Sequence, residues 1–379
     1  METEKYFQML DREIKKTYDI AESARKKGID PIDKVEIPLA RNLAEKTIGL
    51  ISTMYPQVSN PEIVKRILEL EKQYGLLDVS ICLKIAEEVA QEKFCKFDSK
   101  LQAIEAGIPV GFAYTTLGVV SSPIEGFTFL KIGKTRDGKD YFMPYFSGPI
   151  RSAGTTASCV VLMIIDHLRE FFDYAVYDPG EKEIKRTIAE LYDFHERVNN
   201  LQYLPTEEEI EFLAKNLPIQ IAGEPSEKLE VSNYKDLDRV DTNFLRGGFC
   251  LILGEGLAQK APKALRILKK LRKNGFKLSD WDFLEEYCKL HEKRSSGTKD
   301  TSATYLKDLV AGRPIFGHPS RSGAFRFRYG RSRVAGFSAA SVHPATMGIS
   351  NDFLAVGTQL KIEKPTKGCV ISICDSIDG

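Results

Sequence analysis

The segment from Arg313 to Arg333 most constrains how this chain can fold, because aromatic and basic residues alternate within it. Phe325, Phe327 and Tyr329 are separated by single arginines, so in a strand the aromatic residues share one face and the arginines the other. The aromatic face can pack inward, while planar guanidinium groups suit phosphate oxygens. We therefore predict a strand whose basic surface holds a polyanion, most simply a nucleic-acid backbone.

The charge of this segment is one-sided, since it contains six arginines and no acid in a chain of net charge +1. Its alternative interpretation is an edge strand whose arginines discourage pairing between sheets. A solvated edge usually mixes Lys and Glu, which favours the polyanion surface. The candidate backbone contacts are Arg313, His318, Arg321, Arg326, Arg328, Arg331 and Arg333, extended by Lys361, Lys364 and Lys367.

Length and composition limit the class of protein. With 379 residues, 42% apolar and 28% charged, the chain is expected to form about two to three soluble domains. Its near-neutral charge excludes a uniformly basic nucleic-acid protein, so any such binding is local. Seven scattered cysteines without a Cys-x-x-Cys pair disfavour a cysteine zinc site and predict a reducing, cytoplasmic setting. No apolar run reaches membrane-spanning length, so no membrane association is expected.

The first hundred residues read as helices. Apolar residues recur at three- and four-residue spacing between Phe7 and Ala21, which predicts an amphipathic helix. Asn60 followed by Pro61 is typical of a helix start, and further helices are predicted over residues 39–54 and 79–94. From Val110 the periodicity changes towards strands, with a hairpin turn predicted at residues 136–139.

The segment Phe146–Ala157, FSGPIRSAGTTA, leads into an apolar helix predicted over Ser158–Phe171. Backbone N–H groups at the start of this helix, together with Arg151, would suit a phosphate or a carboxylate. The motif is neither G-x-G-x-x-G nor a Walker loop. A purely structural turn is therefore an equal alternative.

The next part of the chain contains a second basic feature. Residues 257–277 predict a helix with eight cations and no acid, in which Lys263 and Arg266 are candidate phosphate contacts and a solvated lysine face is the alternative. Short strands are predicted at Pro218–Ile221 and Phe249–Leu253, after a helix over Ile184–Leu201. The five histidines lack metal-site spacing, so a free-standing metal-dependent nuclease is disfavoured.

The polar segment Lys289–Ala303 is predicted to be a linker or mobile loop, and the residues after it are rich in short strands. The predicted fold class is α+β, with four parts. These are a helical N-terminal module (1–109), a mixed α/β domain (110–288), the linker (289–303) and the opening strands of an incomplete β-barrel (304–379).

Several longer motifs occur here in the order in which they occur in one known family. They are FSGPIRSAGTTA, LQYLPTEEEI, TNFLRGG, GRPIFGHPSRSGAFRFRYGRSR, SVHPATM and AVGTQLKIEKPTKG. On these motifs the chain resembles, over essentially its whole length, the N-terminal part of the large subunit of the archaeal family D DNA polymerase. The resemblance implies a replicative polymerase whose small subunit is a proofreading 3′–5′ exonuclease. It also implies double-psi β-barrels, the first of which would begin after Pro314, near the primer–template DNA.

The family's catalytic carboxylates lie in an Asn-Ala-Asp-x-Asp-Gly-Asp motif that this sequence lacks. Nucleotidyl transfer with Mg²⁺ needs such carboxylates, so no catalytic residue and no metal are expected in this chain, which should not polymerise alone. We expect a fragment, or one half of a split subunit, that engages primer–template DNA with the C-terminal part of the large subunit. The alternative is a non-catalytic assembly module whose helices dock the small subunit or another polymerase chain.

Overall fold

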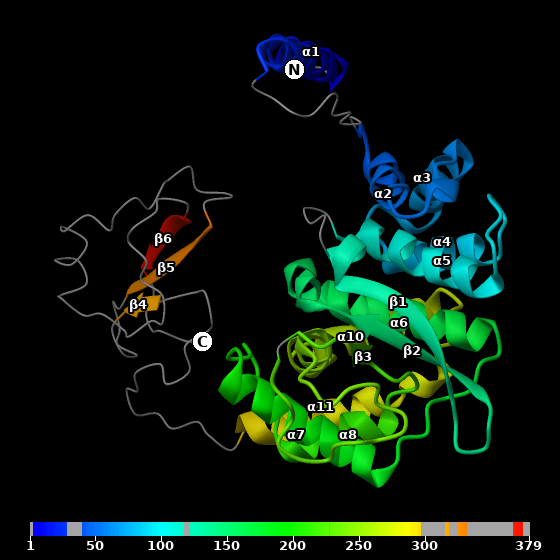
Figure 1. The fold of residues 1–379 in the computed structure, drawn as a ribbon, viewed down its shortest axis with the longest axis vertical. Coiled ribbons are helices and arrows are strands. Elements are labelled where there is room, and N and C mark those ends of the chain that lie inside the picture. The colour runs from blue at the N-terminus through cyan, green and yellow to red at the C-terminus, as the bar shows by residue number, and fades with distance from the viewer. Residues whose placement is uncertain are drawn as a thin grey trace.

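The computed structural model describes residues 3–28, 40–116, 122–226, 228–296, 315–317, 325–331 and 367–373. These residues are mostly helical and include two small three-stranded sheets (Figure 1). Among them, no helix combines the length and the apolar character needed to cross a membrane. The helical character of the N-terminal part and the mixed α and β content are thus confirmed, whereas the described strands form no barrel.

The N-terminal part consists of helices whose starts are fixed by polar caps. The Asn60 side chain accepts the Glu62 N–H, with Pro61 at the first helical position, as the sequence predicts. Ser99 caps the fifth helix in the same way. The bounds are α1 (Thr3–Lys26), α2 (Leu43–Ile51), α3 (Pro61–Tyr74), α4 (Val79–Ala90) and α5 (Lys100–Thr115).

Helix α5 corrects the prediction that strands begin near Val110, because it continues through that residue and beyond residue 109. A Cβ atom at Gly107 would lie 2.5 Å from the Ala86 carbonyl oxygen, and one at Gly111 equally close to the Cys82 oxygen. These glycines therefore let α5 and α4 cross at short range. An apolar segment buried on all sides has no polar face, so its periodicity does not reveal the helix.

The first sheet contains β1 (Phe127–Lys134), β2 (Asp140–Phe146) and the short β3 (Ala222–Gly223). β1 and β2 are antiparallel and joined by the predicted hairpin turn, where Gly138 has a φ of 81°. β3 pairs in parallel with the end of β2. The strand predicted over Pro218–Ile221 is wrong, because the ladder pairs only the two residues that follow it.

Helix α6 (Thr155–Phe171) lies at the centre of the described fold, and its start confirms the predicted strand-to-helix junction. Its residues from Ala157 to Arg169 are buried. They belong, with α4, α5 and later helices, to one hydrophobic cluster that extends in sequence from Ala44 to Cys288. The N-terminal helices and the middle of the chain therefore share a core.

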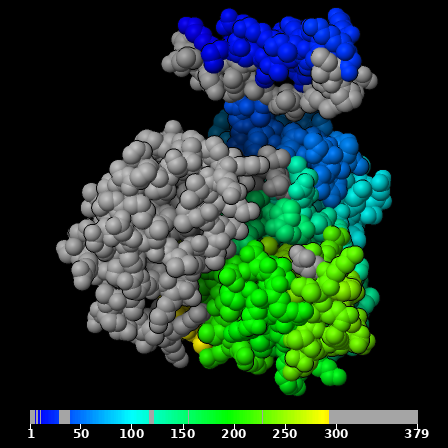
Figure 2. All heavy atoms as spheres, turned by 60° about the vertical axis from the view of Figure 1, so that its left-hand side comes forward, coloured from blue at the N-terminus to red at the C-terminus, as the bar shows by residue number. Residues whose placement is uncertain are grey.

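Of the remaining helices, η4 and α10 pack against α6, whereas α7 and α8 pack against each other and are coloured green in Figure 2. Two predictions from the sequence are wrong in this part of the chain. A strand was predicted over Phe249–Leu253, and the linker was predicted to begin at Lys289, but both positions are helical. The bounds are α7 (Glu181–Arg197), α8 (Glu207–Asn216), α9 (Gly247–Cys250), the π-helix η4 (Leu251–Ala258), α10 (Ala261–Lys273) and α11 (Phe283–Ser296).

The second sheet lies in the C-terminal part of the chain and is antiparallel in the order β4 (Ile315–Gly317), β5 (Phe325–Arg331) and β6 (Lys367–Ile373). This confirms the predicted strand over the alternating segment. β5 is paired on both sides, so the edge-strand alternative does not hold. Most of the strand-rich segment predicted after the linker lies outside the described residues, and the barrel stays a prediction.

Candidate nucleic-acid interface

The alternating strand β5 carries three of the predicted contacts, Arg326, Arg328 and Arg331, and β6 begins with Lys367. Arg326 is paired with Ser372 of β6, and Arg328 with Val370. The three strands of this sheet contain no Asp or Glu, so their own residues supply no counter-charge. Outside the described residues lie Arg313, His318, Arg321, Arg333, Lys361 and Lys364.

A second group of predicted residues meets at the amino-terminal end of α6. The chain leaves β2 at Phe146, forms the 3₁₀ helix η3 (Gly148–Ala153) and enters α6 through Gly154, whose φ is 81°. No side chain caps this start of α6, and a Cβ atom at Gly154 would point into open space. Uncapped N–H groups and the helix dipole make such a terminus attractive to anions.

Arg151 lies in η3 beside this terminus and is partly exposed, with 26% of its side-chain surface accessible. Its Nη2 donates to Oε1 of Glu255 in η4 over 2.8 Å, and the same oxygen accepts the Gln202 N–H at 2.7 Å. Glu255 is buried, so it holds Arg151 from the inner side. The sequence could not reveal this partner, which is 104 positions away.

The start of α10 contributes to the same end of α6. Burial raises the pKa of Cys159, in the first turns of α6, to about 12, and the nearby charges of Lys260 and Lys263 act in the opposite direction. The two lysines are thus close enough to the first turns of α6 to act on Cys159, while Arg151 lies just before the start of the same helix in sequence. Arg151 and Lys263, which were predicted from separate motifs, therefore both lie towards this end of α6.

The rest of α10 is less basic than its sequence indicates. Lys269 pairs with Glu285 at 2.9 Å, Lys270 with Asp78 at 2.6 Å, and Arg272 with Asp282 at 2.5 Å. Burial would raise the pKa of Asp78, but hydrogen bonds from Lys270 and Ser80 lower it overall. By contrast, the predicted contacts Lys263 and Arg266 are exposed and form no ion pair with the described residues.

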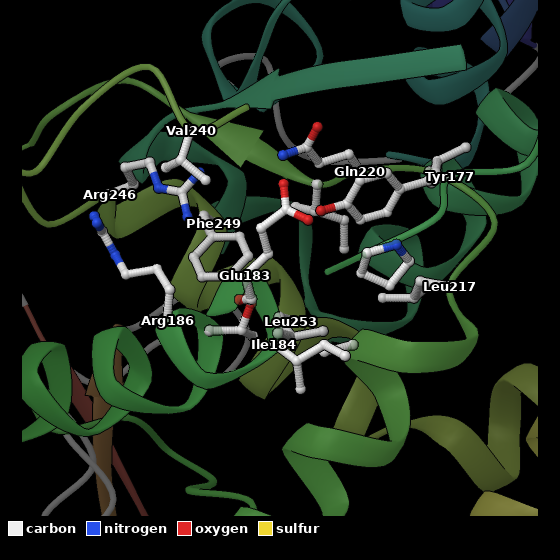
Figure 3. Close-up of a pocket in the computed structure, with 15 residues that line it drawn as sticks. Tyr177, Glu183, Ile184, Arg186, Leu217, Gln220, Val240, Arg246, Phe249 and Leu253 are labelled. Carbon is white, nitrogen blue, oxygen red and sulfur yellow. The ribbon is translucent and has the colours of Figure 1, made fainter. Parts of the chain in front are cut away.

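The pocket in Figure 3 has a structural role that sequence reasoning missed. Arg186 of α7 and Arg246, of the TNFLRGG motif, lie at one end of it and are both buried. The Glu190 carboxylate accepts hydrogen bonds from both, from Nε of Arg186 at 3.1 Å and from Nη2 of Arg246 at 2.8 Å. The cavity is only about 40 Å³, which suits a water molecule and excludes a nucleotide.

Within the described ranges no group of three His, Cys, Asp or Glu residues could hold a metal ion. Among the histidines, His195 accepts the Leu201 N–H at 3.0 Å through Nδ1. His318 and His343 lie outside those ranges.

Two family profiles together cover nearly the whole chain. Residues 5–290 match the profile described as DNA polymerase II large subunit DP2, N-terminal, and residues 291–379 match that of the DP2 central domain. The profiles meet inside the segment for which a linker was predicted. The division of the chain into domains itself stays a prediction.

Large subunits of DNA polymerase II are also similar over the full length of this chain. That of Nanoarchaeum equitans is 40% identical over 98% of the chain, and that of Methanococcoides burtonii 42% over 100%. That of Picrophilus torridus is 42% identical over 99%. The chain spans about a third of the length of these relatives, 32% or 33% in each case. Because both profiles and the relatives agree from end to end, this chain belongs to the DNA polymerase II large subunit family.

Proposed function

We propose that this chain is the DNA-engaging N-terminal section of a replicative DNA-directed DNA polymerase, acting with the other parts of the enzyme. The observation that carries the proposal is the uncapped terminus of α6, with Arg151 beside it and Lys260 and Lys263 near the first turns of the helix. Two ammonium groups and a helix dipole, beside a guanidinium that Glu255 holds in place, suit a phosphate better than a neutral ligand.

The arginine strand extends this proposal to the C-terminal part of the chain. Arg326 and Arg328 lie on a strand paired on both sides, within a sheet whose strands carry no acid. Phosphate contacts position a duplex without reading its sequence, as a replicative enzyme requires. Catalysis would then depend on Mg²⁺-binding aspartates in the part of the subunit that this chain does not span.

Replacing Arg326 and Arg328 together with Ala tests this role directly. We expect weaker binding of primer–template DNA of every sequence. The slope of log K against log salt should become shallower by roughly one unit per lost contact. Fluorescence anisotropy across a salt series measures both effects.

The matched control replaces Lys65 and Lys72, on α3, with Ala, which removes two cations from another surface. That variant should keep the original slope. A slope unchanged by the arginine replacements would remove β5 from the interface.

A second candidate function is assembly, and α1 favours it. None of the residues that form the main hydrophobic cluster comes from α1, in the part of the chain that is described. Its Ile20 is 71% exposed and its Met9 37% exposed. An amphipathic helix without a place in the core suits a groove on a partner, here proposed to be the small subunit.

Truncation distinguishes assembly from DNA binding. Removing residues 1–28 deletes α1 and spares α2, whose Ala44, Ile48 and Ile51 belong to the core. If α1 docks the small subunit, co-purification with that subunit should fall at least about tenfold while DNA affinity is unchanged. Equal recovery of the small subunit with and without residues 1–28 would eliminate this function.

A further inference from the structure

A long groove lies along the outer face of α7, and none of Arg151, Lys260 and Lys263 lines it. It has a volume of about 710 Å³ and is bordered by α8 on one side and by residues 232–234 on the other. The α7 residues that line it recur at helical spacing from Glu181 to Glu196, which makes the groove roughly 22 Å long. A helix of about four turns fits that length.

The floor of the groove is apolar. Ile184, Ile188, Ala189 and Tyr192 follow one another along the face of α7 that it exposes. Ile188, Ala189 and Tyr192 are only partly buried. Ile188 and Tyr192 also pack against the main hydrophobic cluster. A stripe of this kind matches the apolar face of an amphipathic helix.

The rim of the groove is acidic. Five carboxylates line it against two lysines, and those lysines already pair with Glu181 and Glu211 at 2.5 Å. Glu196 and Glu207 are exposed and form no ion pair with described residues. Glu196 lies in the last turn of α7, where a negative charge interacts unfavourably with the helix dipole. Its carboxylate therefore does not stabilise α7.

An aromatic side chain is held at the rim as well. Tyr234 is 40% exposed and has a φ of 56°, a conformation that is unfavourable for a bulky residue. Nη1 of the buried Arg186 donates to its carbonyl oxygen over 3.2 Å, which fixes the backbone there. Exposed tyrosines on rigid backbone are typical of residues that contribute strongly to protein interfaces.

From the floor, the rim and Tyr234 we infer that this groove docks a basic amphipathic helix supplied by a partner polypeptide. Leucine-like side chains would cover Ile188 and Tyr192, and flanking lysines or arginines would face Glu196 and Glu207. The charge of the rim excludes a nucleic-acid backbone from the same surface, so this site is separate from the proposed DNA contacts.

The test uses the full 379-residue chain and a labelled synthetic helix of 15 residues, with leucines at helical spacing and lysines on both flanks. Fluorescence anisotropy should show saturable binding. Replacing Glu196→Lys together with Glu207→Lys should weaken it at least about tenfold, because two attractive rim charges become repulsive. Tyr234→Ser should weaken it about fivefold or more without any change in charge.

Two controls separate this groove from general attraction between opposite charges. Glu62→Lys, an exposed substitution on α3, should leave peptide affinity unchanged. A peptide of identical composition with its leucines scrambled should bind at least about tenfold more weakly.

Three results of the peptide experiment would overturn the inference. They are absence of saturable binding, equal binding to the Glu196→Lys/Glu207→Lys variant, and equal binding of the scrambled peptide. A concentration-dependent dimer that these substitutions abolish, measured by sedimentation, would also overturn it by making a second copy the occupant. None of these results depends on DNA binding, so they leave the proposed function untouched.

Discussion

Replacing Glu190 with Gln is expected to lower the free energy of unfolding by roughly 3–5 kcal/mol, because it leaves two buried guanidinium groups without their shared counter-charge. Glu190 is fully buried, and it is the carboxylate with which both Arg186 and Arg246 pair in the described part of the chain. Breaking such a group by removing one partner costs far more than its net contribution when intact.

Denaturant unfolding followed by circular dichroism measures this loss. The matched control is Glu196→Gln, on the same helix but exposed, which should change the free energy of unfolding by no more than about 0.5 kcal/mol. If the Glu190 variant unfolded at the same denaturant concentration as the unaltered chain, the ion pairs of Glu190 with Arg186 and Arg246 would not be what holds the TNFLRGG motif to α7.

The second large effect is expected at Gly248. A Cβ atom there would lie 2.2 Å from the carbonyl oxygen of Phe146 and 2.5 Å from the N atom of Ser147. Both are backbone atoms at the end of β2, so Gly248→Ala has to push apart α9 and the strand that leads to Arg151. We expect a loss of about 3 kcal/mol in the free energy of unfolding, at the upper end of what overpacking usually costs.

Gly49→Ala is the control for this substitution, since Gly49 lies within α2 and nothing lies within 4 Å of the position that the added methyl group would take. Alanine there should stabilise the chain by roughly 0.5–1 kcal/mol. Thermal unfolding of both variants checks the contrast. A Gly248 variant as stable as the unaltered chain would show that the contact between α9 and β2 is loose.

Local chemistry explains why some elements could be predicted from sequence. Asn60 and Pro61 define a helix start through one hydrogen bond and one fixed dihedral angle, and the structure shows both. The hairpin turn before Lys139 depends in the same way on Gly138 and its positive φ. Such signals act over a few residues, so no tertiary contact is needed to read them.

Other elements depend on contacts that are distant in sequence. The apolar run at Phe249–Leu253 suits either a buried strand or a buried helix, and only its packing against α6 decides for the helix. The polar end of α11 remains helical beside Glu209, which contacts His291 at 3.1 Å. Neither α6 nor Glu209 is close in sequence to the element that it contacts, so a local sequence pattern cannot predict these contacts.

The same limit applies to the candidate interface. Counting charges along α10 predicted an unbalanced basic face, yet Asp78 comes from the start of α4, far from Lys270 in sequence. Conversely, no local pattern relates Arg151 to Lys263, which come from η3 and α10, two elements that both pack against α6. Sequence identified the cations, and tertiary structure decides which of them are free to bind phosphate.

We propose that this chain binds DNA through its phosphates, and one measurement tests this binding most directly. The affinity of the full chain is compared for a primer–template duplex and for the same duplex with uncharged methylphosphonate linkages. We predict strong, salt-dependent binding of the natural duplex and almost none of the uncharged one, because counterion release supplies the free energy. Equal affinity for both duplexes, or binding that does not respond to salt, would contradict the account.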